Sequence, residues 1–166
     1  MSAAGLSGCA VGYLLQAGRG QWQLLRARQP LERLLGSEST AAPLRTSLEL
    51  ARDAREFASR ELGLPDNRSY RSFSALGREY VVWNVVAAPE FSVAPKRWWF
   101  PITGAIAYRG YFREASARRF AAALAARGYD TCVGGVSAYS TLGHFADPVL
   151  DTMLRYGDLQ LVGTIF

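Results

Sequence analysis

The fold prediction starts from the stretch Thr131-Cys-Val-Gly-Gly-Val-Ser-Ala-Tyr-Ser-Thr-Leu-Gly-His-Phe-Ala-Asp-Pro148, which the rest of the chain is expected to support. This β-rich run leads, through a loop that contains Gly and Pro, to the final segment Leu159-Gln-Leu-Val-Gly-Thr-Ile-Phe166, which could begin a helix. Helix ends usually carry Gly or a cation at their close, with Pro beyond, and here only Gly163 is present, inside the segment. We therefore expect the sequence to stop within an element.

Two helical segments are predicted in the first part of the chain. Apolar or small residues recur at alternating spacings of four and three over Tyr13–Leu35, which indicates one helical stripe. Pro30 either kinks this helix or begins a second one, because proline suits a first helical turn. A second stripe runs over Pro43–Leu62, with Gly63 placed to cap its end. The two segments predict an α-hairpin whose Gln, Arg and Glu positions form the solvated face.

The residues that follow this hairpin alternate between strand and helix patterns. After a turn-rich loop over 66–78, strands are predicted at Tyr80–Ala88, Phe100–Phe112 and Tyr129–Ser140, with a helix at Arg113–Arg127. The first strand is a continuous apolar run, which is typical of a strand covered on both faces. The order predicts an α+β fold: an N-terminal helical hairpin, then a small mixed or antiparallel sheet with packed helices.

Length and composition agree with a single α+β domain over residues 10–166. The chain has 166 residues, of which 49% are hydrophobic, and this suffices for a core and excludes a disordered chain. The net charge of +5 can indicate nucleic acid or an anionic membrane surface as a partner. Because the arginines are dispersed and no run of five cations occurs, we expect no nucleic-acid partner. No apolar run of about 18 residues occurs, so no transmembrane helix is predicted.

Few residues could carry metal or nucleophilic chemistry. Cys9 and Cys132 lack metal-ligand spacing; Cys132 is expected to be a small core residue, and a disulfide between them stays open. His144 is the only histidine, so a zinc site with two histidine ligands within this chain is excluded, and no metal ligand is predicted. A triad of Ser140, His144 and Asp147 would need an unusual loop to bring the three groups into contact. We expect Asp147 to cap a turn instead.

The segment Lys96-Arg97-Trp98-Trp99 places two cations beside two indoles. Such a cluster can lie at a membrane interface or bind an anion. The simpler interpretation is that the Trp rings pack while the charges remain solvated, and both interpretations stay open.

The N-terminus carries the pattern that ends a lipoprotein signal. Leu6-Ser-Gly-Cys9 has the small residues that precede a lipidated cysteine, whereas Met1-Ser-Ala-Ala-Gly5 supplies neither a charged region nor an apolar one. We therefore interpret residues 1–9 as a remnant of a lipoprotein signal. Cys9 would be an unmodified thiol in the chain as written and the lipid anchor in a parent protein.

Motifs spread over nearly the whole chain carry a resemblance to a known family. They are Leu6–Tyr13, Phe57–Asn67, Tyr80–Phe91, Tyr108–Phe112 and Val133–Gly143, followed by Phe145, Asp147, Pro148, Leu154, Arg155 and Tyr156. Together they resemble a bacterial family of putative aminopeptidases, zinc metallopeptidases of the zincin type that are predicted lipoproteins.

The resemblance implies a zinc site that follows this chain. In that family the segment equivalent to Leu161–Phe166 continues into His-Glu-x-x-His, whose histidines bind zinc and whose glutamate is the general base. The chain would then be the zincin-like N-terminal part of a peptidase, and zinc would be the cofactor of the full-length parent. We expect this chain to hold no metal and to hydrolyse no peptide alone.

The resemblance also implies a substrate-binding strand. A zincin binds an extended peptide along an edge strand, whose unpaired N–H and C=O groups add the peptide to the sheet. We assign this edge to Val133–Thr141, and the candidate substrate-binding residues are Gly134, Gly135, Val136, Tyr139 and Ser140. The glycines would admit a close backbone, and Tyr139 would donate to a developing oxyanion. An internal strand with a glycine bulge is the structural alternative.

Three functional hypotheses stay open. In the first, the parent is a zinc-dependent aminopeptidase that acts on peptides and is anchored through Cys9 in the bacterial cell envelope, facing the periplasm. In the second, the chain is a non-catalytic envelope interaction domain that binds a partner through an exposed sheet edge. In the third, it is a degraded reading frame without function.

Overall fold

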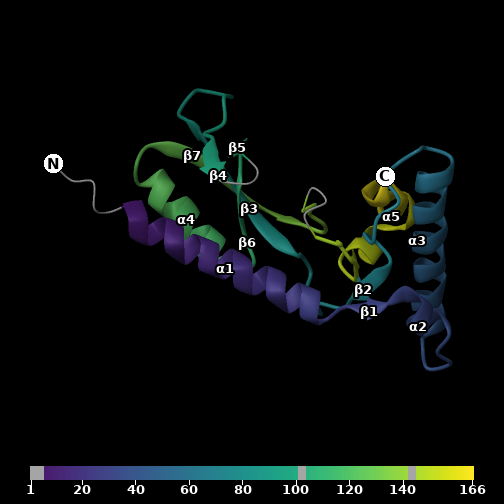
Figure 1. Cartoon of the computed structure of the whole chain (residues 1–166). Helices are drawn as coiled ribbons and strands as arrows, with labels where there is room; N and C mark the ends of the chain where they lie inside the picture. The colour runs from purple at the N-terminus through teal and green to yellow at the C-terminus, as the bar shows by residue number, and fades with distance from the viewer. Residues whose placement is uncertain (1–5, 101–103, 142–144) are drawn as a thin grey trace. The chain divides into compact units, whose positions relative to one another are not determined.

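The computed structural model of the protein describes residues 6–100, 104–141 and 145–166, with side chains described for residues 12, 13 and 15 onward within those ranges. The chain forms two compact units, and each is described by itself. The sheet unit comprises residues 1–21 and 80–136, and the helical unit comprises residues 22–79 and 137–166. Helix α1 (Leu6–Arg26) belongs to the sheet unit through Gln21 and to the helical unit from Trp22 onward (Figure 1).

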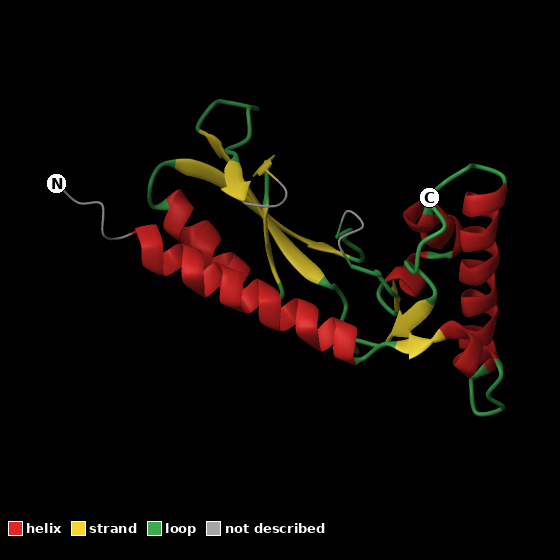
Figure 2. Ribbon diagram, viewed as in Figure 1, coloured by secondary structure: helices red, strands yellow, loops and turns green. Residues whose placement is uncertain are grey.

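The sheet unit is built around β3 (Val82–Pro89), which pairs with a strand on each side. Its antiparallel neighbours are β6 (Arg109–Tyr111) and β7 (Tyr129–Val136), in the order β6-β3-β7 (Figure 2). The pairing of β3 with β7 is unbroken from Val82↔Val136 to Pro89↔Tyr129. No bulge interrupts this ladder, so β7 is a regular strand at one end of the sheet.

One face of this sheet carries the core of the unit. Helix α4 (Glu114–Ala125) buries Ala117, Ala121 and Leu124 against Val85 and Ala87 of β3. Side chains on a strand alternate between its two faces, and the opposite face is more open: Val86 is 39% exposed, and Cys132 is exposed as well. The expectation that this strand is covered on both faces is therefore wrong, and so is the placement of Cys132 in the core.

Helix α1 packs on β6 through a glycine and an amide. Gly20 is buried, and a Cβ atom there would lie 2.2 Å from the ring of Phe112, so only glycine admits that ring. One turn earlier, the Gln16 side chain donates to the Gly110 carbonyl at 3.4 Å and accepts from the Phe112 N–H at 3.3 Å. The glycine that weakens the helical pattern in the sequence is thus required by packing.

A small hairpin completes the sheet unit. Strands β4 (Trp98–Phe100) and β5 (Gly104–Ile106) pair antiparallel, from Trp98↔Ile106 to Phe100↔Gly104. The sequence predicts one strand over Phe100–Phe112, whereas the described residues of this range belong to separate short strands: the last residue of β4, then β5 and β6. Gly104, at φ +70°, adopts a conformation that L side chains rarely reach, which lets the chain turn back.

The helical unit is centred on α3 (Ala42–Arg60), with α2 (Leu31–Leu35) before it and α5 (Asp158–Ile165) packed on it. The buried side chains that α3 contributes include Leu48, Ala51, Ala54 and Ala58. From α5, Leu161 and Ile165 are buried. The rings of Phe57 and Phe166 lie 6.0 Å apart, between centroids.

Three very short strands hold the helical unit together. Strand β2 (Ser72–Ser74) pairs antiparallel with β1 (Gln29–Pro30) and parallel with β8 (Val149–Leu150). The 3-10 helix η1 (Met153–Tyr156) follows β8 and leads to α5. Phe73, Val149 and Leu150 are buried, so this small sheet forms part of the core of the unit.

The α+β fold class is confirmed, as are the two predicted helices that became α3 and α4. Of the two alternatives for Pro30, the second is confirmed: α1 ends at Arg26, and a separate helix α2 begins directly after Pro30. Hence the hairpin partner of α3 is the five-residue α2. The loop predicted over 66–78 contains β2, which was missed because three residues carry no periodic signal. The single domain over 10–166 stays a prediction.

Candidate functional site

The most elaborate polar structure of the helical unit surrounds the loop after α3. Arg55 of α3 is only 4% exposed, and its guanidinium reaches four acceptors. It donates to the carbonyls of Ser69 (3.2 Å) and Pro65 (2.5 Å), to Ser59 Oγ (2.8 Å) and to Asn67 Oδ1 (3.5 Å). Since a buried cation must be compensated by acceptors, Arg55 fixes the path of this loop.

Asp147 joins a second segment to the same loop. Its carboxylate, in a residue 7% exposed, accepts from the Thr141 hydroxyl at 2.8 Å and from the Thr141 N–H at 2.9 Å. Its backbone carbonyl accepts from the Tyr70 N–H at 2.6 Å, and its N–H donates to Ser69 Oγ at 3.4 Å. Asp147 therefore caps the backbone at Thr141, in agreement with the prediction that it is a capping acid.

A pocket of about 340 Å³ lies where these segments meet α5. It is lined by Arg55, Leu64, Pro65, Asn67, Ser69, Tyr70, Ser140, Asp147, Thr164, Ile165 and Phe166. We call it the α5 pocket. The Tyr70 hydroxyl donates to the Thr164 carbonyl at 3.3 Å, and Tyr70 itself has a φ of +60°. A left-handed backbone at a bulky residue is uncommon and tends to occur at functional sites.

Two tyrosines of this unit, Tyr70 and Tyr139, are held in their neutral form. Burial raises the pKa of Tyr70, and the nearby Asp147 carboxylate raises it further, while Arg55 lowers it. Burial likewise raises the pKa of Tyr139, with a further rise from Asp147 and an opposing effect of Arg78. Both phenols therefore keep their proton at neutral pH and can donate it in a hydrogen bond.

The candidate substrate residues fall in both units and are described separately. In the sheet unit, Gly134, Gly135 and Val136 lie in the second half of β7, opposite β3. The Tyr80 ring occupies the space where a side chain of residue 135 would lie, since a Cβ atom on Gly135 would be 2.3 Å from that ring. A Cβ atom on Gly134 would have no neighbouring atom within 4 Å. Gly134 therefore has open space on its side of the sheet, and Gly135 does not.

In the helical unit, Tyr139 is half-buried and Ser140 is exposed, and both follow the end of β7. Ser140 lines the α5 pocket together with Asp147. The Asp147 carboxylate is engaged by Thr141. His144, the base of the rejected triad, lies outside the described residues. The substrate-binding role of the five residues stays a prediction.

The described residues do not fit a zinc ion. In residues 6–100, 104–141 and 145–166, no three His, Cys, Asp or Glu side chains come together in a way that could hold a metal. A zinc site needs three or four such ligands around one point. Cys132 is a free thiol, and the side chain of Cys9, the predicted lipidation site, lies outside the described ones.

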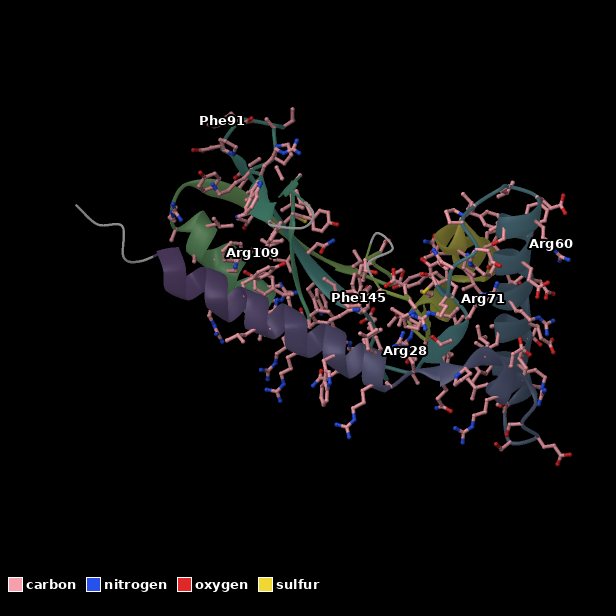
Figure 3. The ribbon with its side chains drawn as sticks, in the orientation of Figure 1. Arg28, Arg60, Arg71, Phe91, Arg109 and Phe145 are labelled. Carbon is pink, nitrogen blue, oxygen red and sulfur yellow. The ribbon has the colours of Figure 1, made fainter. Side chains whose placement is uncertain are left out.

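A second, larger hollow of the helical unit has a volume of about 740 Å³. It is lined by Leu25, Arg28, Pro30, Asn67, Arg68, Ser69, Arg71, Ser72, Phe145 and Ala146, and we call it the arginine pocket. Figure 3 labels Arg28, Arg71 and Phe145 among these side chains. Sequence reasoning missed it, because its residues come from three separate segments of the chain, 25–30, 67–72 and 145–146.

In the segment Lys96–Trp99 of the sheet unit, some side chains pack against neighbouring rings and others are exposed to solvent. Trp98 lies 6.2 Å from the Phe120 ring, between centroids, and Lys96 Nζ lies 5.0 Å from the centroid of the Tyr129 ring. Trp99 is 72% exposed, and Phe91 in the preceding loop is 97% exposed (Figure 3). In the part of the chain that the structure describes, no helix has the length and apolar character needed to cross a membrane.

Comparison with known proteins gives one result. A family model described as "Putative aminopeptidase" matches residues 12–166. Neither a curated protein nor a solved structure shows detectable similarity to the chain. Since the match extends over both units and includes the loop held by Arg55 and the segment closed by Asp147, the chain belongs to this aminopeptidase family.

Proposed function

We propose that this chain is the substrate-binding part of a zinc-dependent aminopeptidase, a hydrolase of peptide bonds. The observation that carries the proposal is the family match over residues 12–166. The zinc would be held by the His-Glu-x-x-His motif that the resemblance places after Leu161–Phe166, since the described residues do not fit a zinc ion. Alone, the chain would then bind peptide without hydrolysing it.

Strand β7 supports a peptide-binding role. It lies at an end of the order β6-β3-β7 and, within the described residues, pairs with β3 only. An extended peptide can add to such an edge through main-chain hydrogen bonds. Gly134, whose face is open, would let the peptide approach the strand closely.

The helical unit supports the proposal through its neutral tyrosines. Because burial and the Asp147 carboxylate raise the pKa of Tyr139, its phenol stays protonated and could donate to a peptide carbonyl. The α5 pocket, beside the last turn of α5, would receive part of the substrate. As part of the same proposal, the parent is a lipoprotein of the bacterial envelope, anchored at Cys9 and facing the periplasm.

Two measurements on the chain as it stands test the proposal. Fluorogenic aminoacyl amides with added zinc should show no turnover that a chelator abolishes; such turnover would mean that the chain holds a complete site. In NMR titrations with an extended peptide that has a free N-terminus, the β7 amides should shift more than those of β6. Equal shifts, or none, would contradict the assignment of β7 as the substrate strand.

The coding DNA past the Phe166 codon offers a cheaper check. An open frame that encodes His-Glu-x-x-His there would support the peptidase parent. A stop codon in an intact regulatory context would favour the non-catalytic envelope domain instead.

A further inference from the structure

The arginine pocket is strongly and uniformly basic. Three of its lining residues are arginines, namely Arg28, Arg68 and Arg71, and no Asp or Glu is among the described residues that line it. All three are exposed, so their charges are accessible from solvent. Such a concentration of one sign of charge in a hollow of about 740 Å³ favours an anionic ligand.

Two of these arginines are oriented before any ligand arrives. Arg28 donates from Nε to the Leu25 carbonyl at 3.1 Å and from Nη1 to the Ala146 carbonyl at 3.0 Å. Arg71 donates from Nε to the Asn67 carbonyl at 3.3 Å. These bonds fix the guanidinium planes and leave other N–H donors of each group for a ligand. A guanidinium group whose orientation is already fixed loses less conformational entropy when it binds a planar anion such as a carboxylate.

The remaining charges leave the pocket with an excess of positive charge. Arg71 forms an ion pair with Asp66 at 2.5 Å, but both side chains are about half exposed, and such surface pairs contribute little. Arg68 makes no hydrogen bond or ion pair with any described residue, so its full donor capacity is available to a ligand.

The pocket also has an apolar wall and a connection to the α5 pocket. Leu25, Pro30 and Phe145 line it, and Phe145 is 50% exposed, which leaves apolar surface for a ligand to cover. Asn67 and Ser69 line both pockets, so the two hollows meet over the loop that Arg55 fixes. A ligand with an acidic and an apolar group matches these walls better than a bare anion does.

We propose that the arginine pocket binds an acidic peptide segment. A carboxylate, from a side chain or from the peptide C-terminus, meets Arg28, Arg68 and Arg71, and a neighbouring apolar side chain packs on Leu25 and Phe145. The inference rests on the proposed function in one respect: it makes acidic peptides the preferred substrates of the adjoining α5 pocket. Its test is a binding measurement, which does not depend on hydrolysis or zinc.

The experiment titrates the intact chain with four probes by NMR and calorimetry. Acetyl-Phe-Glu-amide carries a side-chain carboxylate, acetyl-Phe-Ala carries a C-terminal one, acetyl-Phe-Gln-amide is neutral, and inorganic phosphate is a bare anion. At least one acidic peptide should bind about tenfold more tightly than the neutral one and than phosphate, with shifts in residues 67–72. Added salt should weaken this binding, because the arginines are exposed to solvent.

Arg68→Gln is the informative variant, since Arg68 holds no described part of the fold and its replacement should leave stability unchanged. It should lower the affinity for the acidic peptide by about tenfold. Arg60→Gln is the matched control: Arg60 is an exposed arginine of the same unit that does not line the pocket (Figure 3), and its affinity should stay at the wild-type level.

Three results would overturn the proposal. One is equal affinity for all three peptides, the two acidic ones and the neutral Gln peptide, which would show that no carboxylate is recognised. Another is phosphate binding as tightly as the peptides, which would assign the pocket to a small anion. The third is an Arg68→Gln variant that binds like Arg60→Gln. The β7 titration would be unaffected by any of these, so failure here is distinguishable from failure of the proposed function.

Discussion

The two units of this chain satisfy their polar groups in different ways. In the sheet unit, backbone groups of β3 and β7 pair with one another in an unbroken ladder from Val82↔Val136 to Pro89↔Tyr129. In the helical unit, long irregular segments are held by side chains: Arg55 bonds the loop after α3, Asp147 bonds the turn at Thr141, and Arg45 donates to the carbonyls of Leu35 and Ser37.

This difference predicts opposite sensitivities to mutation. Loss of a polar side chain should have little effect on the stability of a sheet that is held by backbone hydrogen bonds. An added side-chain atom should destabilise the sheet where neighbouring side chains are already in contact. In the helical unit, added side-chain volume at the surface of a loop should have little effect on stability. Loss of the buried cation that bonds the loop should lower stability strongly. The predictions below test this contrast within one molecule.

The largest effect is expected for Arg55→Met in the helical unit. Methionine fills a similar volume but leaves the acceptors at Pro65, Ser69 and Ser59 without their donor, which should destabilise the unit by about 3 kcal/mol. Urea denaturation gives the stability, and hydrogen exchange should show lost protection in residues 64–71 while the β3–β7 amides stay protected.

The matched control for this change is Arg52→Met, on the same helix but with a 38% exposed side chain paired only with Asp53. It should alter stability by less than about 0.5 kcal/mol. If the two variants behaved alike, Arg55 would not be what holds the loop.

A smaller effect is expected from one added methyl group in the sheet unit. Gly135→Ala places a Cβ atom 2.3 Å from the Tyr80 ring, which must move, at a cost of about 2 kcal/mol. Gly134→Ala, one residue away on the same strand, meets nothing within 4 Å and should change stability by less than about 0.5 kcal/mol. Thermal or urea unfolding of the pair measures the difference, and equal stabilities would contradict the packing of Tyr80 on Gly135.

The smallest effects are expected in alkaline solution. Tyr70 and Tyr139 of the helical unit and Tyr13 of the sheet unit all have a raised pKa, chiefly through burial. Above about pH 10 these tyrosines ionise in the unfolded chain while they stay protonated in the folded one. The folded state then binds more protons, so stability is fully present below that pH and falls as the pH rises through it.

The two units should differ in the second cause of these shifts. Asp147 raises the pKa of Tyr70 and Tyr139, whereas Arg109 lowers that of Tyr13. Asp147→Asn should therefore lower the pKa of the first two tyrosines in an absorbance titration and leave Tyr13 unchanged. It should also flatten the alkaline loss of stability, and Tyr139→Phe should flatten it as well. A titration curve unaltered by Asp147→Asn would contradict this electrostatic account.

Much of the fold follows from periodicity in the sequence, and much of the candidate site does not. Helix α3, helix α4 and strand β7 have long stripes or runs whose burial depends on local spacing, so their positions were predicted. The strand expected over Tyr129–Ser140 ends at Val136, however, so Tyr139 and Ser140 lie beyond it. Strands β2 and β8 have three and two residues and form only through pairing with distant segments, which no local sequence pattern indicates.

Arg55 shows why polar residues of the site are harder to predict. It was assigned to the solvated face of its helix, yet it stands four residues after Ala51 and three before Ala58, on the buried stripe itself. That spacing is a usable signal for a buried arginine. Nothing comparable announces the left-handed Tyr70 or the convergence of Arg28, Arg68 and Arg71, which depend on how distant segments meet.

The amide of Gln16 has a further consequence for the sheet unit. By pairing with the Gly110 carbonyl and the Phe112 N–H, it imitates the peptide group of one more strand and covers the outer side of β6. An uncovered strand edge invites other chains to aggregate on it. In the described residues, no side chain covers the outer edge of β7 in this way. A further strand, from a substrate or from an aggregating chain, would therefore add to the sheet beside β7.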